Sequence, residues 1–176
     1  MQKENLLSKI FLFLATASGI LWTGTYFAKF IVLYQLFEPG SELVLREGFN
    51  VAQFSPVFQI IFPVLSLNAI FLPVFFLSLI LYVITSKQSL KDEGWLFIAL
   101  ILMVCTALAE GALLIIFDYP VLMKLNSGSF APQEIFDGIK ARLKLAGGFT
   151  FGVFLVQLTI VFLLTLKPFR KNQPDK

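Results

Sequence analysis

Residues 94–117 read GWLFIALILMVCTALAEGALLIIF, an apolar run interrupted by one charged side chain, the carboxylate of Glu110. A helix rises about 1.5 Å per residue, so about 20 residues cross the ~30 Å hydrocarbon core of a bilayer. A run of this length is therefore typical of a transmembrane helix. A carboxylate inside such a helix costs about 2.5–3.5 kcal/mol or more unless it is paired or neutralised. The stretch predicts a membrane span with a site of structural or functional importance at Glu110.

The rest of the chain repeats this pattern three times. Further apolar runs cover residues 10–37, 56–86 and 146–166, so that little of the 176-residue chain lies outside the four runs. Hydrophobic residues make up 57% of the chain, and its mean hydropathy is +0.83. A water-soluble helical protein would carry charged residues along one face of each helix, which these runs lack. We predict an all-α fold, a four-transmembrane-helix bundle that forms a single integral membrane domain over residues 1–176.

The charged residues other than Glu110 predict how this bundle is oriented. The side with both termini and the link 87–93 carries eight basic and four acidic residues, and the other side carries six of each. Because basic residues are enriched in short cytoplasmic loops, we expect both termini in the cytoplasm. The first apolar run continues well past a cleavage-like Ala15-Thr16-Ala17 segment, so we interpret it as an uncleaved span. The expected location is a bacterial inner (cytoplasmic) membrane.

Residues 132–145 differ from the four apolar runs. Pro132 suits the first position of a helix. Apolar residues then recur at helical spacing, while charged residues take the other faces. The four apolar positions are Ile135, Phe136, Ile139 and Leu143. This pattern predicts a short amphipathic helix before the last span, lying on the outer membrane surface or capping the bundle.

Small residues recur at close spacing on three of the predicted spans. Helices in lipid gain little from hydrophobicity alone, so small residues mark faces where backbones can approach. The positions are Ala15 and Gly19 in the first span, Ala107 and Gly111 in the third, and Gly148 and Gly152 in the fourth. We expect helix-packing seams within the bundle at these positions. The alternative is that one of them, chiefly the Gly148 and Gly152 pair, faces a partner chain.

Polar residues of three spans fall in one layer of the membrane. Counted at ~1.5 Å per residue from the predicted cytoplasmic boundary, Glu110 lies ~25 Å deep, Asn68 ~28 Å and Lys29 ~30 Å. Tyr26 belongs near the same level, so we predict an intramembrane polar cluster of these four side chains. Two interpretations stay open: a network that fixes helix register, or a ligand or proton site open to the outer side. Gln157 lies deeper, and we expect it to form a hydrogen bond between helices.

The composition excludes several kinds of site. With no histidine and one cysteine, Cys105, the chain cannot supply bis-histidine haem ligation, a tetrahedral zinc site or a Ser-His-Asp triad. No glycine-rich loop follows a strand, so nucleotide binding is unsupported. The basic residues suit anchoring at a membrane interface rather than a nucleic-acid surface. We expect no metal, no cofactor and no nucleic-acid partner.

The segment after the third run resembles a known family. Residues 117–125 read FDYPVLMKL and are followed by PQEI at 132–135 and KARL at 140–143. This stretch is similar to the anthrone-oxygenase-like family of small four-span membrane proteins, which follow the third span with a PxNxxL segment and an amphipathic stretch. The resemblance implies the same four-span plan. Leu122 stands where the family has Asn, and the Trp and His residues often found before its last span are absent, so no catalytic residue carries over.

Three classes of function remain. We expect a non-catalytic accessory or structural subunit of a larger membrane complex, because redox ligands are absent, loops are short and small residues mark packing seams. Its partners would be the lipid bilayer and other membrane subunits or a second copy. The alternative is a small membrane enzyme or binder of a hydrophobic molecule, with Glu110 as acid or base and Asn68 or Tyr26 orienting the substrate. A proton pathway ranks last, because the cytoplasmic half offers no second titratable group.

Overall fold

The structure, a computed structural model, describes residues 5–40, 42–47, 50, 55–86, 90, 93–128 and 131–168. Helices account for most of these residues, and no β-strand forms among them. The elements are α1 (Leu6–Tyr34), α2 (Ser55–Ser86), α3 (Gly94–Leu113), the π-helix η2 (Leu114–Asp118), α4 (Tyr119–Ser127), α5 (Pro132–Ala146), the 3-10 turn η3 (Gly147–Phe149) and α6 (Thr150–Leu166). Four continuous helical stretches are long and apolar enough to cross a membrane, which confirms the predicted all-helical, four-helix architecture.

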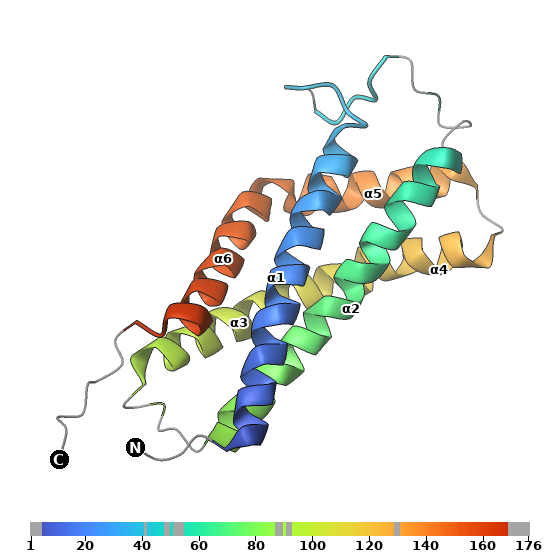
Figure 1. The fold of residues 1–176 in the computed structure, drawn as a ribbon. Coiled ribbons are helices and arrows are strands. Elements are labelled where there is room, and N and C mark those ends of the chain that lie inside the picture. Colours follow the sequence, from blue (N-terminus) through green and yellow to red (C-terminus); the bar gives the residue numbers. More distant parts are fainter. Residues whose placement is uncertain are drawn as a thin grey trace, which may run out of the picture.

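α1, α2 and α6 are steeply inclined in the same sense, and α3 with α4 crosses them at an angle (Figure 1). α1 packs most extensively against α2, and α6 contacts both α1 and α3. α3 and α4 run behind α1 and α2, and α5 crosses behind α1. The start of α1, the end of α2, the start of α3 and the end of α6 share one end of the molecule, here called the proximal end. The opposite, distal end holds α5 and the segment after α1.

The third helix extends further than the sequence predicted. It does not end at Phe117 but passes through the π-helical turn η2 and continues as α4 to Ser127. Gly128 ends α4 with a φ of 66°, a left-handed conformation that costs glycine little because it has no Cβ. The predicted end at Phe117 was therefore wrong, because the polar residues after it form further helical turns rather than a loop.

The first helix is shorter at its distal end than the predicted run. α1 ends at Tyr34, and the chain then folds back on itself. The backbone N–H of Glu38 donates to the Val44 carbonyl at 2.9 Å, and that of Arg46 donates to the Leu36 carbonyl at 3.0 Å. These bonds satisfy backbone groups beyond the helix end, so Phe37 belongs to a small turn and not to the span.

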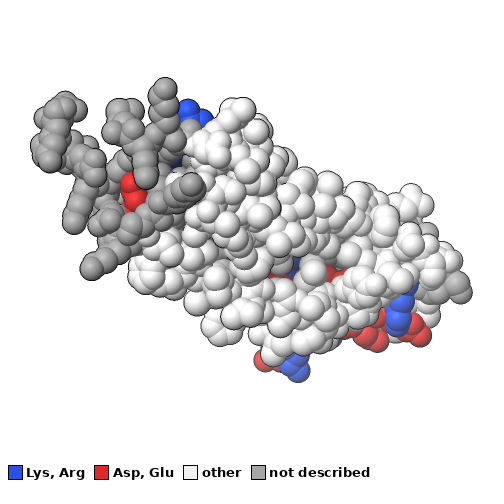
Figure 2. Space-filling view, turned by 90° about the horizontal axis from the view of Figure 1, so that it is seen from below, with Lys and Arg blue, Asp and Glu red and all other residues white. Residues whose placement is uncertain are grey.

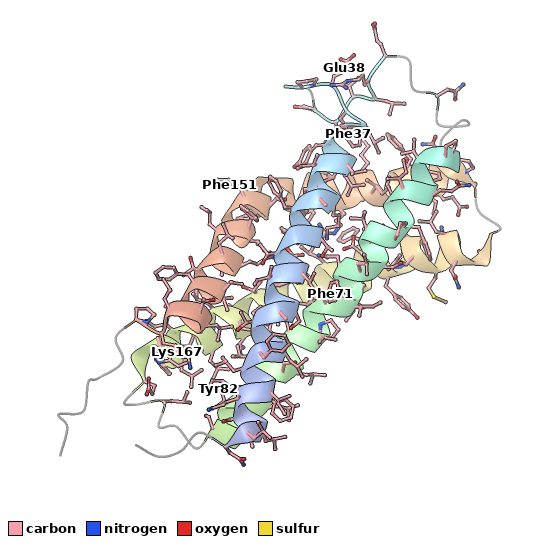
Figure 3. All side chains as sticks on the ribbon, viewed as in Figure 1. Phe37, Glu38, Phe71, Tyr82, Phe151 and Lys167 are labelled. Carbon is pink, nitrogen blue, oxygen red and sulfur yellow. The ribbon has the colours of Figure 1, made fainter. Side chains whose placement is uncertain are left out.

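Two apolar cores fill the interior, one toward each end. The proximal core contains Ala15, Trp22, Leu72, Phe75, Leu79, Tyr82, Trp95, Leu96, Ala99, Met103, Ile160, Leu163 and Leu164. The distal core contains Tyr26, Phe30, Leu33, Leu36, Phe37, Phe58, Ile61, Leu65, Val121, Ile135, Phe136, Ile139 and Leu143. Figure 3 marks the two regions with Tyr82 and Phe37. All four predicted apolar positions of the α5 segment lie in the distal core, so α5 packs that face against the protein.

Candidate functional site: a buried charge network

Four charged side chains meet inside the bundle, next to the distal core. They are Lys29 of α1, Glu110 of α3, Asp118 of η2 and Arg142 of α5. None of these side chains is more than 5% exposed. Charged residues are rarely buried to this degree unless they are paired. The set contains two cations and two anions, so it is formally neutral, and we call it the charge network.

Glu110 is held by two donors, one on each carboxylate oxygen. The Tyr26 hydroxyl donates to Oε1 at 2.8 Å, and Nη2 of Arg142 donates to Oε2 at 2.9 Å. The second bond is also an ion pair, and bonds of this charge-assisted kind are about twice as strong as neutral ones. Glu110 thus links α1 to α5, and neither of its oxygens is free of a donor.

Lys29 occupies the other side of the network. Its Nζ donates to Oδ1 of Asn68 at 3.1 Å and to Oδ2 of Asp118 at 3.3 Å. The ammonium also lies 4.9 Å from the ring centroid of Tyr26 and 5.1 Å from that of Phe30, within the range of cation–π attraction. Lys29 therefore connects α1 to α2 through the amide and to η2 through the carboxylate.

Arg142 bridges the two halves of the network. Its Nε lies 2.7 Å from Oδ1 of Asp118, while its Nη2 binds Glu110. The Nε contact is an ion pair without hydrogen-bond geometry, and within the described chain Nε and Nη1 have no hydrogen-bond acceptor. The guanidinium carbon lies 5.3 Å from the centroid of Phe30. One side chain of α5 thus pairs with carboxylates from both α3 and η2.

The π-helical turn helps to place Asp118 in this network. Asp118 follows Glu110 by eight residues. In a regular α-helix, two positions eight residues apart differ by about 80° around the helix axis, so Asp118 would point away from the face that carries Glu110. A π-turn closes i→i+5 bonds and so uses more residues per turn. Residues 114–118 adopt this conformation, so Asp118 rotates back toward the Glu110 face. π-turns of this kind occur frequently at functional sites.

All four residues of the predicted polar cluster lie in or against the charge network. Tyr26 contacts Glu110, and Asn68 contacts Lys29, but the cation that pairs with Glu110 is Arg142. Sequence reasoning missed Arg142 and Asp118. Arg142 lies on the apolar face of α5, three residues after Ile139. A charged residue at this helical spacing among apolar ones was the sequence signal that could have indicated its burial.

The predicted small-residue seams divide into two groups. Ala15 is fully buried, and a Cβ on Gly19 would lie 3.1 Å from the ring of Phe75, so α1 and α2 approach closely there. Ala107 packs partly against the proximal core. An internal seam at Gly111, Gly148 and Gly152 was the wrong expectation, since among the described residues nothing lies within 4 Å of a Cβ built there.

Gln157 does not form the expected hydrogen bond between helices. The side chain is fully buried, and neither its oxygen nor its nitrogen has a partner in the described part of the chain. Trp22 is also fully buried, with its indole N–H unpartnered within the same ranges. The expectation failed because α6 presents Gln157 to an apolar interior without placing an acceptor or donor opposite it.

The surface around the network is largely uncharged. Figure 2 shows one face on which Lys, Arg, Asp and Glu atoms appear at the margins and, in the middle, only through a small opening. Within the described ranges, no group of three or more His, Cys, Asp or Glu side chains could hold a metal ion. Each carboxylate of the network instead faces cationic nitrogen atoms. The arrangement is suited to joining helices in a medium without water.

Comparison with protein-family models, curated proteins and solved structures finds no match to this chain. The resemblance of residues 117–143 to the anthrone-oxygenase-like family therefore stays a prediction.

Proposed function

We propose that this chain is a non-catalytic accessory or structural subunit of a larger membrane complex. The observation that supports this role is the closed state of the charge network. Both oxygens of Glu110 and both oxygens of Asp118 contact a donor or cation from the protein itself. A general acid or base must reach a proton of the substrate within hydrogen-bond distance. Carboxylates that are fully engaged by their own chain are better suited to fixing helix positions.

The outer faces of α3 and α6 are the proposed contact surface. In the most apolar stretch of α1, and likewise of α2, 33% of the residues are buried inside the protein. The corresponding share is 17% for the helical stretch 94–127 and 22% for 132–166, so these two stretches expose more of their apolar surface. Large apolar side chains on α3 and η2 point outward, among them Phe97, Ile101, Leu108, Ile115 and Ile116. Gly148 and Gly152 leave a shallow surface at the start of α6. Such faces allow close approach of another helix.

The proposal includes an orientation. The excess of basic residues on the side of both termini supports a cytoplasmic position for the proximal end. α5 would then cap the bundle at the outer surface of a bacterial inner membrane. The polar face of α5 carries Glu134, which forms an ion pair with Lys124 of α4, and Lys144 in the last turn. This face would meet the headgroup region.

Site-specific photo-crosslinking in intact host membranes tests the accessory role. A benzophenone amino acid replaces Leu108 on α3, which is 71% exposed, or Leu155 on α6. The matched control replaces Ile70 on the outer face of α2, which is 55% exposed and equally apolar. We expect a discrete protein adduct, of a partner or a second copy, from the α3 and α6 positions and lipid adducts alone from Ile70. Lipid adducts alone at all three positions would rule out the proposed surface.

A further inference from the structure

A cavity of about 180 Å³ lies between α1 and the start of α6, beside the charge network. Its walls are mainly aromatic: Tyr26, Phe27, Phe30, Tyr34, Phe151 and Phe154. Phe151, labelled near the start of α6 in Figure 3, is 66% exposed, and Phe27 on α1 is 48% exposed. The cavity therefore opens between two helices toward the lipid rather than toward an aqueous loop.

The volume of the cavity suits one small ring. An apolar cavity of about 150 Å³ in a protein interior takes up benzene, so 180 Å³ has room for one substituted six-membered ring. The rings of Phe27 and Phe154 are stacked on each other, with centroids 4.9 Å apart and planes at 25°, so they form one continuous aromatic wall against which a ligand ring can pack.

Two hydroxyl groups give the cavity a polar edge. The Tyr34 hydroxyl has no hydrogen-bond partner among the residues that the structure describes, so its proton is available. Gly147 leaves room for this hydroxyl, since a Cβ at position 147 would collide with it. The Thr150 hydroxyl donates to the Ala146 carbonyl at 3.3 Å and so retains its acceptor lone pairs. A ring that carries its own oxygen would find both a donor and an acceptor here.

We propose that this cavity binds the oxygen-bearing ring of a membrane-soluble phenol or quinone, with its apolar tail lying in the lipid between α1 and α6. The proposal does not depend on the accessory role, because a subunit and an isolated bundle would offer the same cavity. Tyr26 forms one wall and donates its hydroxyl to Glu110, so a bound ring lies directly against a side chain that is hydrogen-bonded to the charge network. The network thereby holds one wall of the site in place.

Fluorescence quenching in nanodiscs tests this binding site. The chain has two tryptophans, so Trp95→Phe leaves Trp22 as the single emitter. The Trp22 ring lies 6.1 Å from that of Tyr26, close enough to report a quencher in the cavity. The probe is a benzoquinone with a decyl tail. We expect saturable quenching, displaced by 4-decylphenol but not by decane at the same membrane concentration.

Three variants separate the cavity from the lipid. Tyr34→Phe should weaken binding about three- to tenfold, the effect of one lost hydrogen bond. Gly147→Val should abolish the saturable component by filling the rim. Phe162→Leu, at a lipid-facing position of α6 outside the cavity, is the matched control and should bind as the parent does. Quenching that rises linearly and equally in all variants, or displacement by decane as effective as by decylphenol, would overturn the proposal. Tyr34→Phe keeps the test valid if Gly147→Val does not fold.

Discussion

The proximal and distal halves of the bundle are held together by different means. The proximal core is apolar, built around side chains such as Phe75, Leu79 and Trp95. The distal half adds the charge network to a similar apolar core. In lipid the outer faces of helices are as apolar as the inner ones, so apolar contacts distinguish helix rotations weakly. Charged groups must turn inward, and they therefore fix which faces of α1, α3 and α5 meet.

The largest effect on the distal half is expected from removing Arg142, the cation that bridges Glu110 and Asp118. Arg142→Met leaves the carboxylates of Glu110 and Asp118 buried without the guanidinium between them. Breaking a buried ion pair from one side costs about 3–5 kcal/mol, because a charge is left uncompensated. We expect a loss of this size in the free energy of unfolding, measured by denaturant titration in mixed micelles. Wild-type stability in this variant would show that the network does not hold the distal half.

A truncation in the proximal core gives the apolar counterpart. Leu79→Ala opens a cavity next to Phe75 and should cost about 2 kcal/mol, the low end for such changes. The low end applies because the unfolded helix in lipid is already surrounded by apolar groups, leaving chiefly the packing loss. Leu77→Ala on the same helix, at a position 56% exposed, is the control and should change stability by less than about 0.5 kcal/mol. Equal losses from the two variants would contradict the assigned core.

Removing one hydroxyl from the edge of the network should have a smaller effect. Tyr26→Phe keeps the ring but deletes the 2.8 Å bond to Glu110, and a hydrogen bond to a charged group contributes about 1.5–3 kcal/mol. We expect a loss near the lower figure, since Arg142 still holds the carboxylate. Tyr119→Phe, at a position 56% exposed, tests the same atom change outside the network and should be neutral in the same titration. A neutral Tyr26→Phe would mean that this bond adds nothing to the fold.

The smallest loss of stability is expected at the exposed ion pair between Lys124 and Glu134. Lys124 and Glu134 are 2.7 Å apart, but their side chains are 46% and 56% exposed. Pairs of this kind contribute about 0–1 kcal/mol because water solvates both partners. Lys124→Ala should therefore leave the unfolding free energy within about 1 kcal/mol of the wild type. A loss as large as that of Arg142→Met would show that burial does not explain the difference.

The sequence was sufficient for the spans and for part of the site. Length and hydropathy predicted four membrane-crossing helices, because a water-free core requires long apolar runs whatever the tertiary contacts are. Depth along the helices placed Tyr26, Lys29, Asn68 and Glu110 at one level, and all four lie in or against the network. Axial position follows from the fixed rise of a helix, so this part of the geometry needs no tertiary information.

The parts of the site that the sequence did not predict depend on how each helix is rotated about its axis and on a local departure from α-helical geometry. The π-turn that redirects Asp118 has no sequence signature, and the predicted apolar run ended within this turn, one residue before Asp118. Arg142 falls in the predicted amphipathic helix 132–145, outside the four predicted spans, and was counted only among the charges of the outer side. Its burial depends on carboxylates contributed by two other elements. Gly148 and Gly152 resemble Gly19 in sequence, but among the described residues a neighbouring helix packs against Gly19 and nothing lies close to the other two.

The most direct test of the central claim is a pair of double-mutant cycles measured in the same mixed micelles. One cycle combines Glu110→Gln with Arg142→Met, and the other combines Lys124→Ala with Glu134→Ala. If the charge network holds the distal half, the buried pair should show a coupling energy above about 1.5 kcal/mol, with the double variant more stable than the two single losses predict. The exposed pair should show less than about 0.5 kcal/mol. Equal and small couplings in both cycles would contradict the account.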